Sequence, residues 1–181
     1  MAVVQERKAQ AKLTSWEFFY SLDMAIACLI SFSVVTYVLA PLMALPHAFL
    51  GGMWAAVATL FVFRPTRTEA TSAGISRLSA TGVSFVLCLV YLVILPFHPV
   101  GLAVLIGVGT AIMFYLDRRE DIIITGITTT VVMVSAAISP QDAWLQPVWR
   151  LCDTVLGVAV GVTCKWIASF LYFRCIGKLP K

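Results

Sequence analysis

The segment at residues 146–161, QPVWRLCDTVLGVAVG, sets two charges in an apolar run. Arg150 and Asp153 stand three positions apart, and the residues around them are largely apolar. A single charge of this kind at the centre of a transmembrane helix costs about 2.5–3.5 kcal/mol. Residues three apart on a helix share one face, so we expect Arg150 and Asp153 to neutralise each other. The segment predicts a membrane helix whose charged face points into the protein.

The composition of the whole chain agrees with a membrane location. Of its 181 residues, 60% are hydrophobic and 12% are charged. A soluble domain has about 45–50% apolar and about 25% charged residues. The net charge of +4 is typical of a membrane protein oriented in the bilayer by its basic residues, and we expect no nucleic-acid partner.

Six apolar runs, at residues 18–40, 47–63, 71–95, 100–116, 122–139 and 148–173, organise the chain. About 20 helical residues cross a bilayer, and the runs are continuously apolar where barrel strands would alternate. We therefore predict an all-α membrane protein with six transmembrane helices. Residues 1–17 form an N-terminal segment, residues 18–173 form the membrane domain, and residues 174–181 form a tail.

The basic residues predict the orientation. They occur before the first run, after the second and fourth runs, and after the sixth run, whereas the other three connections have none. Such a bias marks the cytoplasmic side, so both termini are expected there and the first run is expected to remain uncleaved. The ten residues are Arg7, Lys8, Lys12, Arg64, Arg67, Arg118, Arg119, Arg174, Lys178 and Lys181.

A short repeat links the two halves of the chain. RLSATGVS from Arg77 and RLCDTVLG from Arg150 share Arg-Leu-x-x-Thr at a separation of 73 residues, and Pro65 and Pro140 precede them. Each half, at about 18–95 and 100–173, holds three spans, so the halves would be inserted in opposite directions. Inverted repeats of this kind recur in secondary transporters, where the substrate site lies between the halves.

Three more charges lie within the apolar runs: Asp23, Arg77 and Lys165. Asp23 and Arg77 have similar predicted depths from the cytoplasm, which makes an interhelical ion pair possible. Lys165 is near the end of the sixth run, and we expect its long side chain to reach the membrane surface.

Small and polar residues accompany the two arginines. Gly157 and Gly161 form a G-x-x-x-G motif beside Thr154, and such motifs allow another helix to approach closely. Thr81, Ser84 and Cys88 form the matching stripe after Arg77. We expect both stripes to face each other or a shared cavity, to guide an anion or a proton. The alternative is purely architectural, with the charges and glycines holding two helices in register.

Other side chains give weaker signals. The threonines of the fifth run are expected to bond their own helix backbone, and His47 and His98 to act as caps at span edges. The five cysteines show no C-x-x-C pair. Since enzyme motifs are also missing from the sequence, we expect neither an enzyme nor a metal or cofactor.

Residues 51–84, GGMWAAVATLFVFRPTRTEATSAGISRLSATGVS, and residues 127–161, ITTTVVMVSAAISPQDAWLQPVWRLCDTVLGVAVG, carry a family resemblance. Their Trp-Ala-Ala segment, proline-bearing turn and Arg-Leu-x-x-Thr helices resemble the fusaric acid resistance and aromatic acid exporter family. With the six-span layout, the resemblance covers most of residues 18–173.

The resemblance implies a multi-pass protein of the bacterial inner membrane that exports aromatic or other organic carboxylic acids. Arg77 and Arg150 would bind the carboxylate, Asp23 and Asp153 would carry a coupling proton, and Trp54 and Trp149 would contact the aromatic ring, although both tryptophans also suit interfacial anchoring. The alternatives are a passive anion channel and a non-transporting scaffold. Larger family members have a cytoplasmic domain and often a second membrane unit, so we expect a homodimer or an additional transport subunit.

Overall fold

The structure is a computed structural model that describes residues 15–42 and 48–176. His47 lies outside these ranges. The described chain is helical and has no strand, which confirms the all-α prediction. Its longer elements are α2 (Ser15–Ser33), α4 (Ala48–Val62), α5 (Arg67–Ile94), α6 (Pro99–Tyr115), α7 (Ile122–Ile138) and α8 (Gln146–Ile176).

Short elements join or extend these helices. The π-helical segment η1 (Val34–Leu39) carries α2 directly into α3 (Ala40–Leu42). The 3-10 helices η2 (Arg119–Asp121) and η3 (Pro140–Leu145) precede α7 and α8. Each predicted apolar run therefore corresponds to one helical stretch.

Local capping explains two of the helix starts. The Thr66 hydroxyl accepts a hydrogen bond of 3.3 Å from the backbone N–H of Glu69, at the start of α5. The His98 Nδ1 accepts one of 3.2 Å from the N–H of Val100, and Pro99 occupies the first turn of α6. The capping role predicted for His98 is confirmed.

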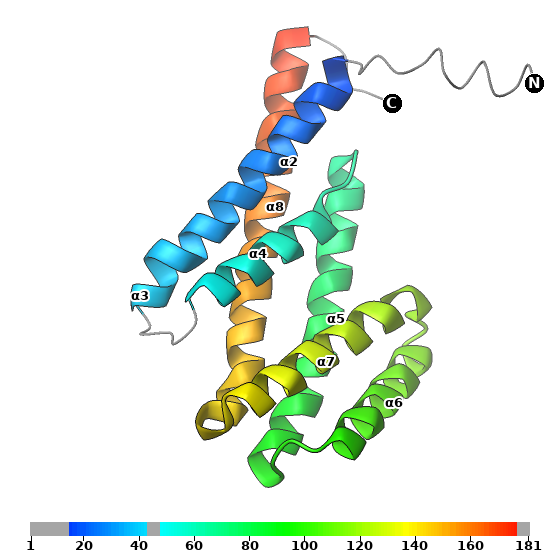
Figure 1. The fold of residues 1–181 in the computed structure, drawn as a ribbon. Coiled ribbons are helices and arrows are strands. Elements are labelled where there is room, and N and C mark those ends of the chain that lie inside the picture. Colours follow the sequence, from blue (N-terminus) through cyan, green and yellow to red (C-terminus); the bar gives the residue numbers. More distant parts are fainter. Residues whose placement is uncertain (1–14, 43–47, 177–181) are drawn as a thin grey trace, which may run out of the picture.

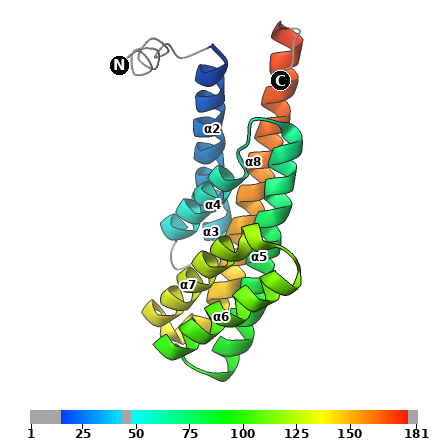
Figure 2. The same ribbon diagram turned by 90° about the vertical axis from the view of Figure 1, so that its right-hand side faces the viewer.

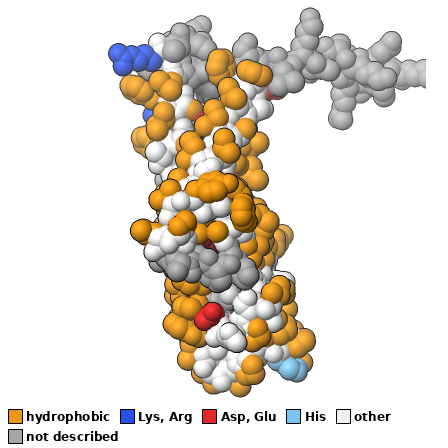
Figure 3. Space-filling view, turned by 60° about the vertical axis from the view of Figure 1, so that its left-hand side comes forward, with side chains coloured by type: hydrophobic (Ala, Val, Ile, Leu, Met, Phe, Trp, Pro, Cys, Tyr) orange, Lys and Arg blue, Asp and Glu red, His pale blue; other side chains and the backbone are white. Residues whose placement is uncertain are grey.

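Four helical stretches are long and apolar enough to cross a membrane: Glu17–Leu42, Arg67–Ile94, Arg119–Ile138 and Pro140–Leu171. The helices α4 and α6 are also apolar but shorter, with 15 and 17 residues. Hydrophobic side chains cover much of the face drawn in Figure 3. Such a surface suits a protein whose solvent is lipid.

The helices α5 and α8 run in opposite directions along each other (Figures 1 and 2). At their contact, a side chain at Gly74 would meet Val158 and Val162. The helices α4 and α7 cross the same face of this pair, again with opposite chain directions (Figures 1 and 2). Helix α4 packs mainly on α8 and α2, whereas α7 packs mainly on α5 and α6.

Candidate anion site

The small residues of α8 receive helix α4. A Cβ atom at Gly157 would clash with the carbonyl oxygen of Ala55, and one at Gly161 would lie 3.3 Å from the Thr59 Cγ2. The Thr59 hydroxyl bridges the crossing, because it lies 2.9 Å from the carbonyl oxygen of Gly157 and 3.0 Å from that of Ala55. Glycine allows the two backbones to approach this closely.

A second crossing joins α5 to α7. The Ser84 hydroxyl lies 3.0 Å from the carbonyl oxygen of Thr125, to which it donates, and the Thr129 hydroxyl lies 3.2 Å from the Ser84 hydroxyl. The stripes on α5 and α8 therefore contact α7 and α4, respectively, whereas we expected them to face each other or a shared cavity. Three threonines of α7 also bond their own backbone, as predicted: Thr125, Thr128 and Thr130.

Arg150 does not form the expected ion pair with Asp153. Its guanidinium carbon lies 4.0 Å from the centre of the Trp54 ring, and its three nitrogens have no hydrogen-bond partner among the described residues. Side chains on a helix lean toward its N-terminus, so Arg150, which precedes Asp153, reaches away from it. The Asp153 carboxylate instead lies beside Gly51 on α4.

Arg77 also lacks the partner suggested by the sequence. It is 1% exposed, its guanidinium carbon lies 4.5 Å from the centre of the Phe61 ring, and within the described ranges no group accepts a hydrogen bond from it. The proposed pair with Asp23 is wrong because α2 packs on α4 and α8, which separates it from Arg77 on α5.

Asp23 and Lys165 interact electrostatically across α2 and α8. Lys165 is only 2% exposed, and its amine lies 4.5 Å from the centre of the Tyr20 ring and 5.1 Å from that of Phe63. The prediction that Lys165 reaches the membrane surface is therefore wrong. Aromatic rings and a nearby carboxylate provide a setting in which a buried ammonium is stabilised.

The predicted threonines lie close to the arginines in sequence and are both buried. The Thr154 hydroxyl donates to the carbonyl oxygen of Arg150 over 2.9 Å. The Thr81 hydroxyl has no hydrogen-bond partner in the part of the chain that is described. Thr81 therefore places a second unpaired polar group, its hydroxyl, one helical turn after the unpaired guanidinium of Arg77.

Arg77 lies in the wall of a cavity of about 300 Å³. We call this the Arg77 cavity. Three exposed charged residues, Arg64, Glu69 and Glu120, also line it and connect it to the surface. Its other lining residues are Phe61, Ser72, Ala73, Ser76 and Ile124.

Arg150 lies in the wall of a much smaller cavity of about 30 Å³, the Arg150 cavity. Trp54 and Trp149 line it as well, so the structure brings together the three residues expected to bind an aromatic acid. The buried indole N–H of Trp149 has no acceptor among the residues that can be placed. The other lining residues are Leu50, Val131, Val132, Ser135 and Gln146.

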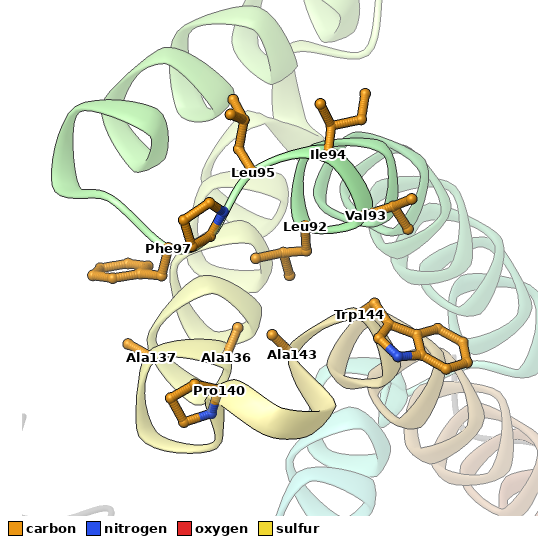
Figure 4. Close-up of a pocket in the computed structure, with 11 residues that line it drawn as sticks. Leu92, Val93, Ile94, Leu95, Phe97, Ala136, Ala137, Pro140, Ala143 and Trp144 are labelled. Atoms are coloured by element: carbon orange, nitrogen blue, oxygen red, sulfur yellow. The ribbon is translucent and has the colours of Figure 1, made fainter.

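A larger cavity, of about 450 Å³, lies between the end of α5, the end of α7 and η3 (Figure 4). It contains apolar side chains such as Leu92, Phe97 and Trp144, and none of its lining residues is charged. A carboxylate would find no counter-charge there. The arginine cavities are therefore the better candidates for an anion.

Asp121 is a buried charge that the sequence interpretation missed. Although the sequence places it in a polar connection, it is fully buried. Its carboxylate lies 2.7 Å from the Arg118 Nε and accepts a hydrogen bond from the Ser76 hydroxyl. Arg118 also donates to the Ser79 hydroxyl over 3.0 Å, so the cluster ties the start of α7 to α5.

A comparison with protein families identifies the chain. The model of the fusaric acid resistance protein-like family matches residues 34–164, which is more than half of the 181 residues. The chain belongs to this family. The matched range of this family member contains both cavities and both arginines. Together with the apolar helices, the family establishes a membrane protein. No curated protein and no solved structure matches the chain.

Proposed function

We propose that this protein is a secondary transporter that exports organic carboxylic acids, in particular aromatic ones, from the bacterial cytoplasm. The observation that carries the proposal is the pair of buried arginines, Arg77 and Arg150, whose guanidinium nitrogens find no acceptor within the described chain. A buried, unpaired charge is costly, and a carboxylate is the ligand whose two oxygens match the guanidinium fork.

The surroundings of Arg150 favour an aromatic acid. Trp54 of α4 and Trp149 of α8 both line its cavity, and the Trp149 N–H is a further donor. Asp153 is 5% exposed and within electrostatic range of Arg150. Asp153, and Asp23 next to Lys165, are the carboxylates that would exchange a proton during transport.

The proposed topology has six spans, cytoplasmic termini and two inverted halves in the inner membrane. The short helices α4 and α6 would then cross as well. Support for the repeat comes from packing, because α4 on α8 and α7 on α5 are corresponding contacts in the two halves. We further propose that two copies associate, since the larger architecture described for the family contains two membrane units.

Flux into proteoliposomes tests this function, with benzoate as the aromatic acid and a pH gradient as the driving force. Uphill, gradient-driven uptake supports the transporter, uncoupled conductance supports an anion channel, and the absence of flux supports a scaffold. Arg150→Ala is expected to reduce flux by about tenfold or more, because a charged hydrogen bond contributes about 1.5–3 kcal/mol. Arg150→Lys retains the positive charge but lacks the guanidinium fork. Its flux should lie between that of the unaltered protein and that of Arg150→Ala.

The matched control is Arg119→Ala, which removes an exposed arginine that lines neither cavity. Its flux should remain at the level of the unaltered protein. Gel filtration in detergent verifies that each variant is folded and monodisperse. Unchanged flux in folded Arg150→Ala protein would remove the basis for the proposed role.

A further inference from the structure

The two helix crossings provide an alignment of the two halves that does not depend on the cavities. Ser84 on α5 and Gly157 on α8 are 73 positions apart and occupy the two crossings. Ser84 contacts Thr125 and Thr129, while Gly157 contacts Ala55 and Thr59. These partners are spaced alike, and those on α7 follow those on α4 by 70 positions. The crossings therefore relate α5 to α8 by 73 positions and α4 to α7 by 70.

The 73-position relation pairs α5 residues that line the Arg77 cavity with α8 residues that line the Arg150 cavity. All three α8 residues that line the Arg150 cavity have counterparts that line the Arg77 cavity. These pairs are Ala73 with Gln146, Ser76 with Trp149, and Arg77 with Arg150.

The 70-position relation matches three further pairs of lining residues, although Val132 and Ser135 of the Arg150 cavity have no counterpart in the Arg77 cavity. Phe61 of α4 corresponds to Val131 of α7, and each lines its own cavity. Glu120 and Ile124, which line the Arg77 cavity, correspond to Leu50 and Trp54, which line the Arg150 cavity. Because contacts outside the cavity walls fixed this alignment, the agreement indicates two equivalent sites, one at each end of α4 and α7.

The equivalent sites differ greatly in size. The Arg77 cavity has about 300 Å³, close to the lower limit for small-molecule pockets. The Arg150 cavity has about 30 Å³, which is far below the range of small-molecule pockets. In this structure a carboxylic acid therefore fits the first cavity and not the second.

We propose that the two cavities are opposite ends of one carboxylate pathway between α4 and α7 that open alternately, and that this structure is the form open at Arg77. The inference rests on the proposed function and extends it. When the inverted halves exchange conformations, the Arg150 cavity widens and the Arg77 cavity closes. With the termini in the cytoplasm, the form described here accepts substrate from inside the cell.

The charges on the pathway suit a passing anion. Arg150 lies within electrostatic range of Arg77, so the two guanidinium groups repel each other. A carboxylate bound at either one lowers this repulsion. An anion is therefore attracted more strongly than a neutral molecule at both ends of the pathway.

Cysteine accessibility tests the alternation separately from flux. The five native cysteines are replaced, and Ala73→Cys or Gln146→Cys is introduced as a reporter at equivalent positions of the two cavities. A membrane-impermeant maleimide is then applied from either face of proteoliposomes. Ala73 and Gln146 are both half-buried, so the size of the neighbouring cavity decides how fast the reagent reaches each. Without cross-linking, we expect Ala73→Cys to react several-fold faster than Gln146→Cys.

A second cysteine pair closes one cavity. Arg64→Cys and Glu120→Cys line the Arg77 cavity from the α4–α5 turn and from η2, and a bifunctional thiol reagent joins them before the reporter is labelled. The bifunctional reagent also modifies a reporter cysteine that reacts fast, so the slowly labelled Gln146→Cys provides the readout. Its labelling should rise several-fold after bridging. The matched control uses a monofunctional reagent of the same chemistry, which should leave the labelling of Gln146→Cys slow.

The outcomes separate the alternation from the substrate. If bridging is complete and Gln146→Cys labelling does not change, alternation is overturned, even when benzoate flux demonstrates a carboxylate pathway. Equal labelling rates of the two reporters without bridging also overturn it and support a channel. If labelling shifts between the reporters while no carboxylate is transported, alternation is supported and the proposed substrate is wrong.

Discussion

At the scale of single residues, the two buried arginines have partners other than those suggested by sequence spacing. Arg150 and Arg77 lie against Trp54 and Phe61 rings, whereas Asp121 has the complete set of polar contacts. Ring faces stabilise a cation without occupying its hydrogen-bond donors. The arginines are therefore held in place with their donors still available, which is the state that an anion site requires.

The buried carboxylate of Asp121 leads to a prediction about stability. Asp121→Asn keeps the shape but removes the negative charge that faces Arg118, so we expect a loss of about 1.5–3 kcal/mol. Thermal unfolding in detergent measures this loss of unfolding free energy. Glu120→Gln, at the exposed neighbouring position, should change stability by less than about 0.5 kcal/mol. Equal effects of the two variants would show that the Arg118 contact contributes little.

At the scale of helices, the fold depends on the two crossings. At the α4–α8 crossing, Gly157→Ala would force its Cβ against the Ala55 carbonyl oxygen, and we expect a loss of about 1–3 kcal/mol in unfolding free energy. Gly82→Ala is the matched control, because a Cβ there meets nothing within 4 Å and alanine favours the helix by up to about 1 kcal/mol. Thermal unfolding of both variants in the same detergent decides the point. A stable Gly157→Ala protein would mean that α4 can shift freely on α8.

The helices were predictable from sequence, but their partners were not. Continuous apolar runs mark each helix because lipid requires apolar side chains along the whole length. The G-x-x-x-G motif predicts close approach by another helix, yet nothing in its residues distinguishes α4 from α5 as the partner. For the same reason Arg150 was paired with Asp153, the neighbour visible in the sequence, and not with Trp54, which only the packing of α4 brings within reach. Asp121 was missed because a charge next to Arg118 and Arg119 is typical of a solvated turn.

At the scale of the whole molecule, the span count has a direct test. In a cysteine-free variant, Thr68→Cys lies near the start of α5 and His98→Cys lies between α5 and α6, and both positions are exposed. If α4 and α6 cross the membrane, Thr68→Cys reacts with impermeant maleimide from the cytoplasm and His98→Cys from outside. If only the four longer stretches cross, the two reactivities are reversed. A reporter fused to the C-terminal tail shows which side of the membrane is the cytoplasmic one and so provides the reference for both labelling results.

The interlocked packing of α4 and α8 also affects biogenesis. The hydrogen bond from Thr59 to Gly157 joins residues 98 positions apart, so α4 is synthesised well before the surface that covers it. At about 5–20 residues per second, α4 waits roughly 5–20 seconds for α8 to follow. During this time its other main neighbour is α2, which has already been made. Until α8 is made, the nascent α2–α4 pair therefore lacks the helix that covers the flank of α4 around Thr59.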